Sequence, residues 1–272
     1  MKYGVLERTV PSKNGTVDTL YEAGEAGFDG IALQIDDPSP DSHLAWSAAG
    51  RAKLRRAAVD ADIEIMSVSP SFYWQGWEGG SGFISDDQSE RNLAVDALEH
   101  AIDAAGALGA DLVLLPFFGT CEITEQKHKD RIVDALTEVA ATANLVDVTI
   151  TLETSLPAGE NAKIIDVVDS SAVKICYDAA NKAALYGLDP VAEIEELGSR
   201  IGEYHVKDFH EPPPEFPDNY AALGEGAVDQ QAVADALTEV GFNGWAMLET
   251  ELDKPLEYTA DELAYTRELF GD

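Results

Sequence analysis

Val173-Lys174-Ile175-Cys176-Tyr177-Asp178 is a short apolar run that ends on an acidic residue. Seven other runs along the chain are equally short and rich in Val, Ile or Leu, without clean polar alternation. Parallel strands that are covered on both faces have this character. The predicted strands are Tyr3–Leu6, Gly30–Ile35, Ile63–Val68, Asp111–Pro116, Val148–Leu152, Val173–Tyr177, Gly202–Val206 and Trp245–Leu248.

The segments between these runs have the apolar spacing of amphipathic helices. Ser85 to Gln88 reads as a capping box ahead of one helix, and Thr124 begins another. The second helix has apolar residues spaced by four, three and four, at Ile132, Leu136, Val139 and Ala143. Glycines are expected to end helices just before the following strand, at Gly27, Gly109 and Gly241.

Eight strand–helix units in 272 residues match the size of an α/β protein of the (β/α)8 TIM barrel class. No linker rich in Pro, Gly or Ser divides the chain, so we expect residues 1–272 to form a single domain. An open doubly wound sheet is the competing fold, because alternation of strands and helices does not say whether the sheet closes.

The chain is strongly acidic, with 18 Lys and Arg against 51 Asp and Glu and a formal net charge of −33. This balance argues against nucleic acid as a partner, and the absence of a long apolar run argues against a membrane span. The acidic residues are spread along the chain, which favours a halophile with a salt-rich cytoplasm over a local docking face. The two cysteines, Cys121 and Cys176, are expected to be buried thiols.

Metal-capable side chains come at the ends of the last four predicted strands. They are Glu153, Asp178, His205 and Glu249, at spacings of 25, 27 and 44 residues. In a (β/α)8 barrel the chemistry lies at the carboxyl ends of the strands, so these four side chains are expected to meet. Oxygen ligands with one imidazole suit Mn²⁺, the favoured ion, or Mg²⁺ or Co²⁺. Taken alone, a Glu or Asp at a strand end is more often a helix cap or a salt-bridge partner, and a His is more often a hydrogen-bonded core residue. The set of four at the strand ends favours a metal.

The order of these and other segments resembles the sugar isomerase/epimerase branch of the xylose isomerase-like barrels over essentially the whole chain. Its matching segments are Gly27–Ile31, Tyr177–Asn181, His205–Asp208, Leu223–Asp229, Gly241–Trp245 and Leu248–Thr250. In that family a glutamate, an aspartate, a histidine and a second glutamate bind a divalent metal. The resemblance places these roles on Glu153, Asp178, His205 and Glu249.

Within the family the chain most resembles the L-ribulose-5-phosphate 3-epimerases. It shares their Glu7-Arg8 pair, their Trp46-Ser47 pair and their Asn181, which makes Glu7 and Asn181 candidates for substrate binding. Lys207 is a candidate for a substrate hydroxyl or phosphate, and equally for pairing with a carboxylate. Trp74 and Phe117 are candidates for the wall of a sugar pocket, and equally for packing under a loop. The segment after the third strand, 69–74, lacks the His and Arg of the phosphopentulose enzymes.

The chemistry expected of such a site is proton transfer next to a ketose carbonyl. A divalent metal would chelate the carbonyl and a neighbouring hydroxyl, and a carboxylate would remove the proton to give a metal-bound enediolate. Glu153 and Glu249 are the expected acid/base pair, with 3-epimerisation favoured over isomerisation, and the small-molecule partner is a sugar or sugar phosphate. The sequence does not decide whether the protein forms a homo-oligomer.

Three alternatives remain at this stage. A sugar or cyclitol dehydratase of the same superfamily would use the same site. Metal-dependent phosphodiester hydrolysis would need more histidines than the five in the chain. A non-catalytic sugar-binding barrel would bind metal without turning over any ketose.

Overall fold

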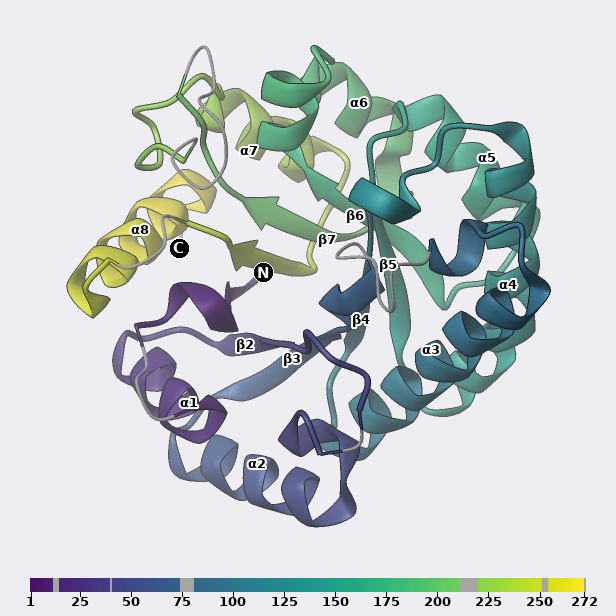
Figure 1. Ribbon diagram of the computed structural model, residues 1–272. Coiled ribbons are helices and arrows are strands. Elements are labelled where there is room, and N and C mark those ends of the chain that lie inside the picture. The colour runs from purple at the N-terminus through teal and green to yellow at the C-terminus, as the bar shows by residue number, and fades with distance from the viewer. Residues whose placement is uncertain (12–14, 40, 74–80, 211–219, 251–253, 272) are drawn as a thin grey trace. The chain divides into compact units, whose positions relative to one another are not determined.

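The computed structural model (Figure 1) describes residues 1–11, 15–39, 41–73, 81–210, 220–250 and 254–271. Its eight strands are hydrogen-bonded in sequence order as a closed barrel, and β1 also pairs in parallel with β8. The chain is therefore a (β/α)8 TIM barrel, as the sequence predicts. The strands are β1 (Lys2–Leu6), β2 (Gly30–Gln34), β3 (Glu64–Ser69), β4 (Leu112–Phe117), β5 (Thr149–Thr154), β6 (Val173–Asp178), β7 (Ile201–Val206) and β8 (Trp245–Leu248).

Burial along the strands explains why they read as continuous apolar runs. All six residues of β4 are buried, and only the first residue of β5 is not. These two strands pair in parallel over their full length, from Leu112 opposite Thr149 to Phe117 opposite Thr154. Because a barrel strand packs against side chains inside and helices outside, neither face needs polar residues.

A helix follows each strand in the chain. The helices are α1 (Thr16–Glu25), α2 (Ala48–Asp60), α3 (Gln88–Leu108), α4 (Gln126–Leu145), α5 (Ala158–Val168), α6 (Pro190–Leu197), α7 (Gln230–Glu239) and α8 (Leu256–Phe270). The predicted glycine stops are confirmed, since Gly27, Gly109 and Gly241 all have positive φ, between 74° and 89°. This left-handed conformation is the one that a glycine adopts without steric cost.

The predicted starts of α3 and α4 are wrong by two residues. Asp87, not Ser85, caps α3, and its carboxylate accepts a hydrogen bond of 2.8 Å from the Ser89 amide. The Ser85 hydroxyl is engaged elsewhere, because it donates to Glu90 at 2.6 Å. α4 begins at Gln126 rather than Thr124.

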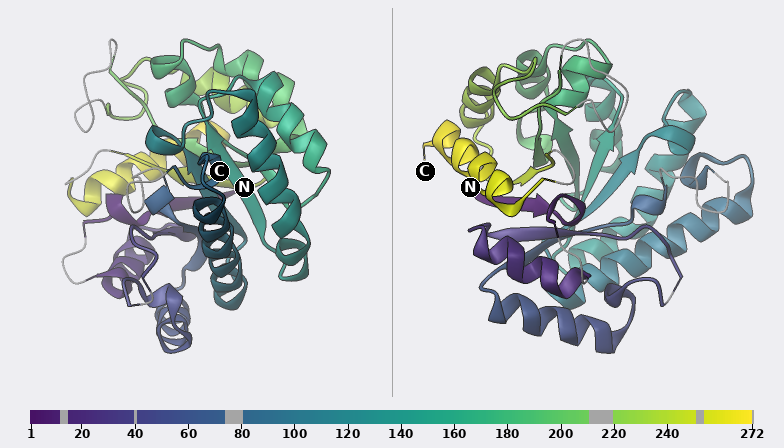
Figure 2. Two further views of the ribbon diagram at one scale, coloured as in Figure 1. Left: turned by 45° about the vertical axis from the view of Figure 1, so that its right-hand side comes forward. Right: turned by 60° about the vertical axis from the view of Figure 1, so that its left-hand side comes forward.

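The chain divides into two compact units that we describe separately. The first unit comprises residues 1–32, 57–64 and 176–272. In it, α8 lies against the first strand (Figure 2), and the ring of Phe270 is 6.4 Å from the rings of both Tyr3 and Tyr204. The second unit comprises residues 33–56 and 65–175, and α3 and α4 pack against each other within it. A single domain over residues 1–272 stays a prediction.

Two further expectations can be compared with the structure. Cys121 and Cys176 are both free and buried, as predicted, and burial raises the pKa of the Cys121 thiol to about 12. Among the described helices, none combines the length and the apolar character that crossing a membrane would require.

Candidate active site

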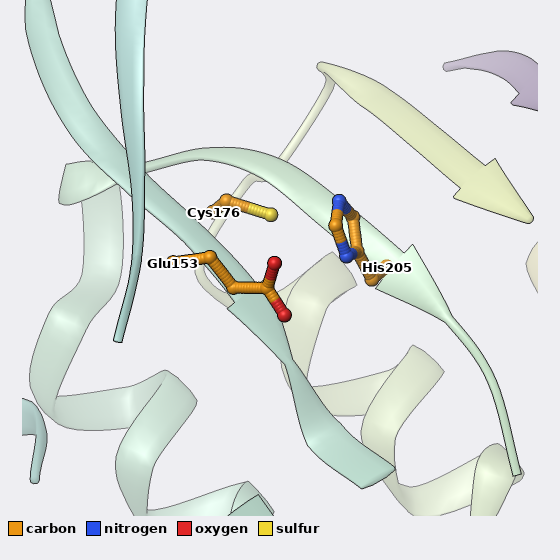
Figure 3. Close-up of side chains that lie close together, drawn as sticks. All are labelled: Glu153, Cys176 and His205. Carbon is orange, nitrogen blue, oxygen red and sulfur yellow. The ribbon is translucent and has the colours of Figure 1, made fainter. Parts of the chain in front are cut away.

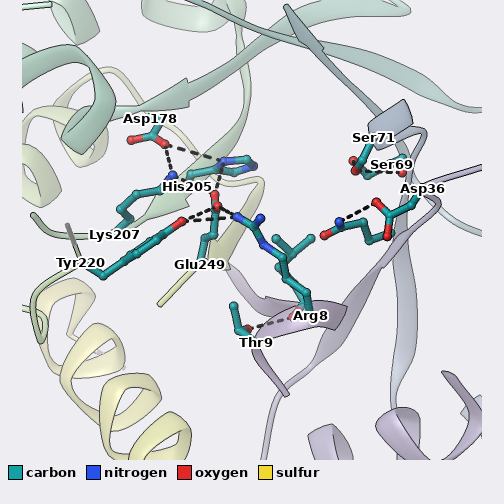
Figure 4. Close-up of polar contacts among 12 residues, drawn as sticks. Arg8, Thr9, Asp36, Ser69, Ser71, Asp178, His205, Lys207, Tyr220 and Glu249 are labelled. Carbon is teal, nitrogen blue, oxygen red and sulfur yellow. Dashed lines mark hydrogen bonds and ion pairs between the residues drawn. The ribbon is translucent and has the colours of Figure 1, made fainter. Parts of the chain in front are cut away.

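Three of the predicted metal ligands come together at the carboxyl ends of neighbouring strands (Figure 4). Asp178 is the last residue of β6, His205 is the penultimate residue of β7, and Glu249 directly follows β8. Their side chains are buried, with no more than 8% exposed. Nδ1 of His205 lies 4.0 Å from Oδ2 of Asp178 and 3.6 Å from Oε2 of Glu249. Two carboxylate oxygens and one imidazole nitrogen therefore share a single small space.

A lysine supplies the positive charge within this cluster. Nζ of Lys207 lies 2.9 Å from Oδ2 of Asp178 and 2.9 Å from Oε2 of Glu249. The two oxygens that face His205 are thus the same two that hold the ammonium group. Carboxylates buried at this depth repel each other unless a cation lies near them. The arrangement is that of a cation site whose oxygens converge.

The carboxylate of Asp178 is held by a hydrogen bond to its other oxygen, Oδ1. Its Oδ1 accepts a hydrogen bond of 2.8 Å from the backbone amide of Asn181, in the first turn after β6. The donor is the main-chain amide, so this contact does not depend on the asparagine side chain. With Oδ1 occupied in this way, Oδ2 is directed into the cluster.

Glu249 is held by both of its oxygens. Oε1 accepts a hydrogen bond of 2.8 Å from the Tyr220 hydroxyl and a further one from the guanidinium of Arg8. The same guanidinium lies 3.3 Å from the Tyr220 oxygen. Oε2 faces Lys207 and His205, so the carboxylate has little freedom to turn.

The charges around Glu249 decide its protonation. Burial by itself would raise the pKa of Glu249, but the positive charges of Lys207 and Arg8, with His205, hold that pKa well below its usual range. Burial raises the pKa of Tyr220, and the neighbouring Glu249 charge raises it further. The tyrosine therefore stays a hydrogen-bond donor, and the glutamate stays charged.

The loop that carries Tyr220 is tied to Asp208, two residues beyond the end of β7. The Asp208 carboxylate accepts hydrogen bonds of 2.9 to 3.1 Å from four backbone amides, those of Phe209, Gly224, Gly226 and Val228. Phe209 and Tyr220 form an antiparallel bridge within this loop. A Cβ atom on Gly226 would lie 2.1 Å from the Asp208 carboxylate, so the close approach needs glycine.

The other predicted site residues come from other parts of the chain. Glu153, buried on β5, and Phe117, buried at the end of β4, belong to the second unit, where the Phe117 ring lies 5.9 Å from that of Phe83. Glu7 is half-buried in the 3₁₀ turn Glu7–Thr9, and Trp74 lies outside the described residues. The roles of these four residues, and of the Asn181 side chain, stay predictions.

Three residues beside this cluster have no role that the sequence predicts. Arg8 was noted only as part of the Glu7-Arg8 pair, and Tyr220 lies in a loop without a regular pattern. Cys176 lies two residues before Asp178 on β6, and its sulfur is within 4.8 Å of a His205 ring nitrogen (Figure 3, which also draws Glu153 on β5). The two-residue period of a strand, which puts Cys176 and Asp178 on one face, was the available signal for Cys176.

The donor set fits a hard divalent ion. In an octahedral sphere with bonds of about 2.1 Å, ligand atoms stand between about 3 and 4.2 Å apart. The His205 distances of 3.6 and 4.0 Å fall inside that range. The carboxylates and the neutral imidazole are donors that Mn²⁺, Mg²⁺ and Co²⁺ accept.

The fold and this cluster define a (β/α)8 barrel with an acidic, histidine-containing site at the carboxyl ends of its strands. Among known protein families, the one described as xylose isomerase-like TIM barrel matches residues 20–269 of this chain. The chain belongs to that family.

Individual relatives are more distant. SgbU of Escherichia coli (strain K12), which its name assigns to the L-ribulose-5-phosphate 3-epimerases, is 25% identical over 264 residues, covering 93% of this chain and 90% of SgbU. A solved structure of D-psicose 3-epimerase in the presence of D-fructose superposes with a TM-score of 0.78 at 15% identity, over all of both chains. One of L-ribulose 3-epimerase gives a TM-score of 0.73 at 21% identity, over 97% of this chain and 86% of the other. At these identities the two structures show the fold alone.

Proposed function

We propose that this chain is a divalent-metal-dependent epimerase or isomerase of a ketose or ketose phosphate, with 3-epimerisation favoured. The observation that carries the proposal is the convergence of Asp178 Oδ2, His205 Nδ1 and Glu249 Oε2 within 4.8 Å of one another. Family membership supports it, as does the relative SgbU, whose name is that of an L-ribulose-5-phosphate 3-epimerase.

Asp178, His205 and Glu249 would hold the metal, with Mn²⁺ the favoured ion. We extend the ligand set to Glu153, because β5 belongs to the same closed barrel and Glu153 is its penultimate residue. Parallel strands present their carboxyl ends on one side, which is where barrel enzymes place their chemistry. When bound, the ion polarises a substrate carbonyl and acidifies the neighbouring C–H bond.

The proposed role of Lys207 depends on the ion. Its ammonium group now bridges the two oxygens that a divalent ion would take, so we expect the flexible side chain to turn away when the ion binds. The amine would then be available for a hydroxyl or phosphate of the substrate. Arg8 and Tyr220 keep their contacts to Glu249 Oε1, on the other side of that carboxylate.

Glu153 and Glu249 are the proposed acid/base pair. One carboxylate takes the proton from the carbon next to the carbonyl, and the other returns it. Return to the opposite face of that carbon inverts it, which is epimerisation. Return to the neighbouring carbon from one face gives the isomer.

A screen in D₂O tests this function. Purified protein with Mn²⁺ is incubated with free ketoses and ketose phosphates of five and six carbons, and ¹H NMR follows the products. The proposal predicts a 3-epimer with deuterium at C3 for one substrate class. Loss of water from a ketose or a cyclitol would indicate a dehydratase, and binding without turnover of any member would indicate a sugar-binding barrel.

A further inference from the structure

Strand β7 directs an acidic side chain into the barrel below the metal-ligating histidine. Tyr204 packs on the ring of Phe270 in α8, so the side chain of residue 204 faces the helices. Neighbours along a strand point to opposite faces, and residues 203 and 205 therefore both face the barrel interior. Glu203 and His205 lie one above the other on that face.

The burial of Glu203 needs a physical reason. Its side chain is 0% exposed, and a carboxylate at that depth is costly unless hydrogen bonds or an opposite charge compensate it. Branched apolar residues normally fill this layer of a barrel.

The two nitrogens of His205 face different groups. Nδ1 faces the cluster, at 3.6 Å from Glu249 Oε2, whereas Nε2 lies 3.7 Å from Oε1 of Glu203. A neutral imidazole carries one N–H and one lone pair, and a carboxylate beside one nitrogen favours the proton there. Because carboxylates lie near both nitrogens, the position of the proton depends on the ion. A divalent ion at the cluster would take the Nδ1 lone pair, which leaves the imidazole proton on Nε2, beside Glu203.

We propose that Glu203 is a positioning residue that holds His205 by Nε2 and presents the Nδ1 lone pair to the metal. The inference rests on the proposed function, since it assumes that a divalent ion binds at the cluster. A histidine that binds a metal through one nitrogen commonly donates its other N–H to a carboxylate, which fixes the ring. Glu203 touches neither metal nor substrate and acts through His205.

Substitution separates positioning from a structural role. Glu203→Met keeps the length of the side chain and removes a buried charge, so the melting temperature of the metal-free protein should stay the same or rise. The Mn²⁺ affinity, measured by calorimetry, should nevertheless fall about 10- to 100-fold. Glu203→Gln keeps an acceptor for the Nε2 proton and should lose less. Glu193→Gln, which neutralises another buried acid on α6, is the matched control and should bind Mn²⁺ as the wild type does.

The tautomer itself is measurable without any change to Glu203. In wild-type protein with ¹⁵N-labelled histidine and saturating diamagnetic Mg²⁺, the His205 signals are assigned by their loss in His205→Gln. A protonated Nε2 and an unprotonated Nδ1 are expected. A proton on Nδ1 would overturn the inference, even if Glu203→Met fails to fold.

The outcomes separate this inference from the function on which it rests. If the wild type binds no divalent ion at all, the proposed function is refuted, and the role of Glu203 with it. If the wild type binds Mn²⁺ and folded Glu203→Met binds it equally well, only the role of Glu203 is refuted.

Discussion

Glu249 is held at the site by polar contacts to both of its carboxylate oxygens. Four side chains surround its two oxygens: Arg8 and Tyr220 at Oε1, Lys207 and His205 at Oε2. Such surroundings stabilise the charged carboxylate despite its burial. A charged, oriented carboxylate is the form that a metal ligand or a general base requires.

The first prediction concerns the two glutamates. Glu249→Gln and Glu153→Gln keep the side-chain shape but remove the group that accepts a proton. Each should lower kcat on the order of 10²–10⁴-fold. Steady-state kinetics on the substrate found in the screen measures this, and wild-type turnover in either variant would exclude that residue as an acid or base.

A second prediction concerns the hydroxyl of Tyr220. Tyr220→Phe keeps the ring against Phe209, whose centroid is 5.3 Å away, and removes the hydrogen bond to Glu249 Oε1. Because Arg8 still holds that oxygen, the Mn²⁺ affinity should fall by only about tenfold, at the lower end of the range for groups that orient metal ligands. Tyr21→Phe, at a partly exposed position on α1, is the control. Equal Mn²⁺ affinity in the wild type and Tyr220→Phe would show that the hydroxyl has no such role.

Strand-end positions were predictable from the sequence, and the residues that support them were less so. Asp178, His205 and Glu249 each come at the end of an apolar run, and the fold brings such ends together. Arg8 and Tyr220 reach Glu249 from a 3₁₀ turn and a long loop, where no periodicity indicates direction. Glu203 lies inside a strand, and from the sequence alone a glutamate there would be expected to face solvent.

At the scale of elements, the loop after β7 is organised by a single carboxylate. Asp208 binds four amides of residues 209 to 228, and this fixes the segment on which Tyr220 stands. Asp208, just beyond the end of β7, thereby helps to position Tyr220, whose hydroxyl donates to Glu249.

A third prediction tests this organisation. Asp208→Asn replaces one accepting oxygen with a donor, so amides of the loop lose their partner at a cost of about 1–3 kcal/mol in the free energy of unfolding. Urea denaturation measures the change. Asp229→Asn, at the cap of α7, is a matched control with little expected loss, because Asn caps helices as well as Asp does. A stability equal to that of the wild type in Asp208→Asn would contradict the assigned role.

Helix starts show where element prediction reaches its limit. Ser85 and Asp87 both have side chains that can cap α3, and the sequence does not say which will. The structure uses Asp87, while the Ser85 hydroxyl bonds to Glu90. Apolar periodicity was the stronger signal, since Ile132, Leu136, Val139 and Ala143 are all buried along α4, as expected.

For the whole molecule, the dominant property is its net charge of −33. Some carboxylates are locally compensated, as where Lys129 and Lys163 hold the pKa of the half-buried Glu160 down to about 2 through hydrogen bonds. The 18 basic residues cannot neutralise 51 acidic ones, so self-repulsion opposes the folded state.

The fourth prediction follows from this imbalance. The melting temperature should rise as KCl increases from about 0.1 M to above 1 M, because the screening length falls from about 10 Å to 3 Å. Strengthened apolar burial should add to the rise when a kosmotropic salt such as sulfate is used. Differential scanning calorimetry of metal-free protein measures the effect. A flat or falling melting temperature would indicate that the acidity serves a localised docking surface instead.

We propose that a divalent ion held by Asp178, His205 and Glu249 enables proton transfer on a ketose. Deuterium incorporation from D₂O into the identified ketose measures this directly, in protein stripped of metal by a chelator and then resupplied with Mn²⁺. Exchange should be lost when the metal is stripped and should return with about one Mn²⁺ per chain. Undiminished exchange in the metal-free protein would contradict it.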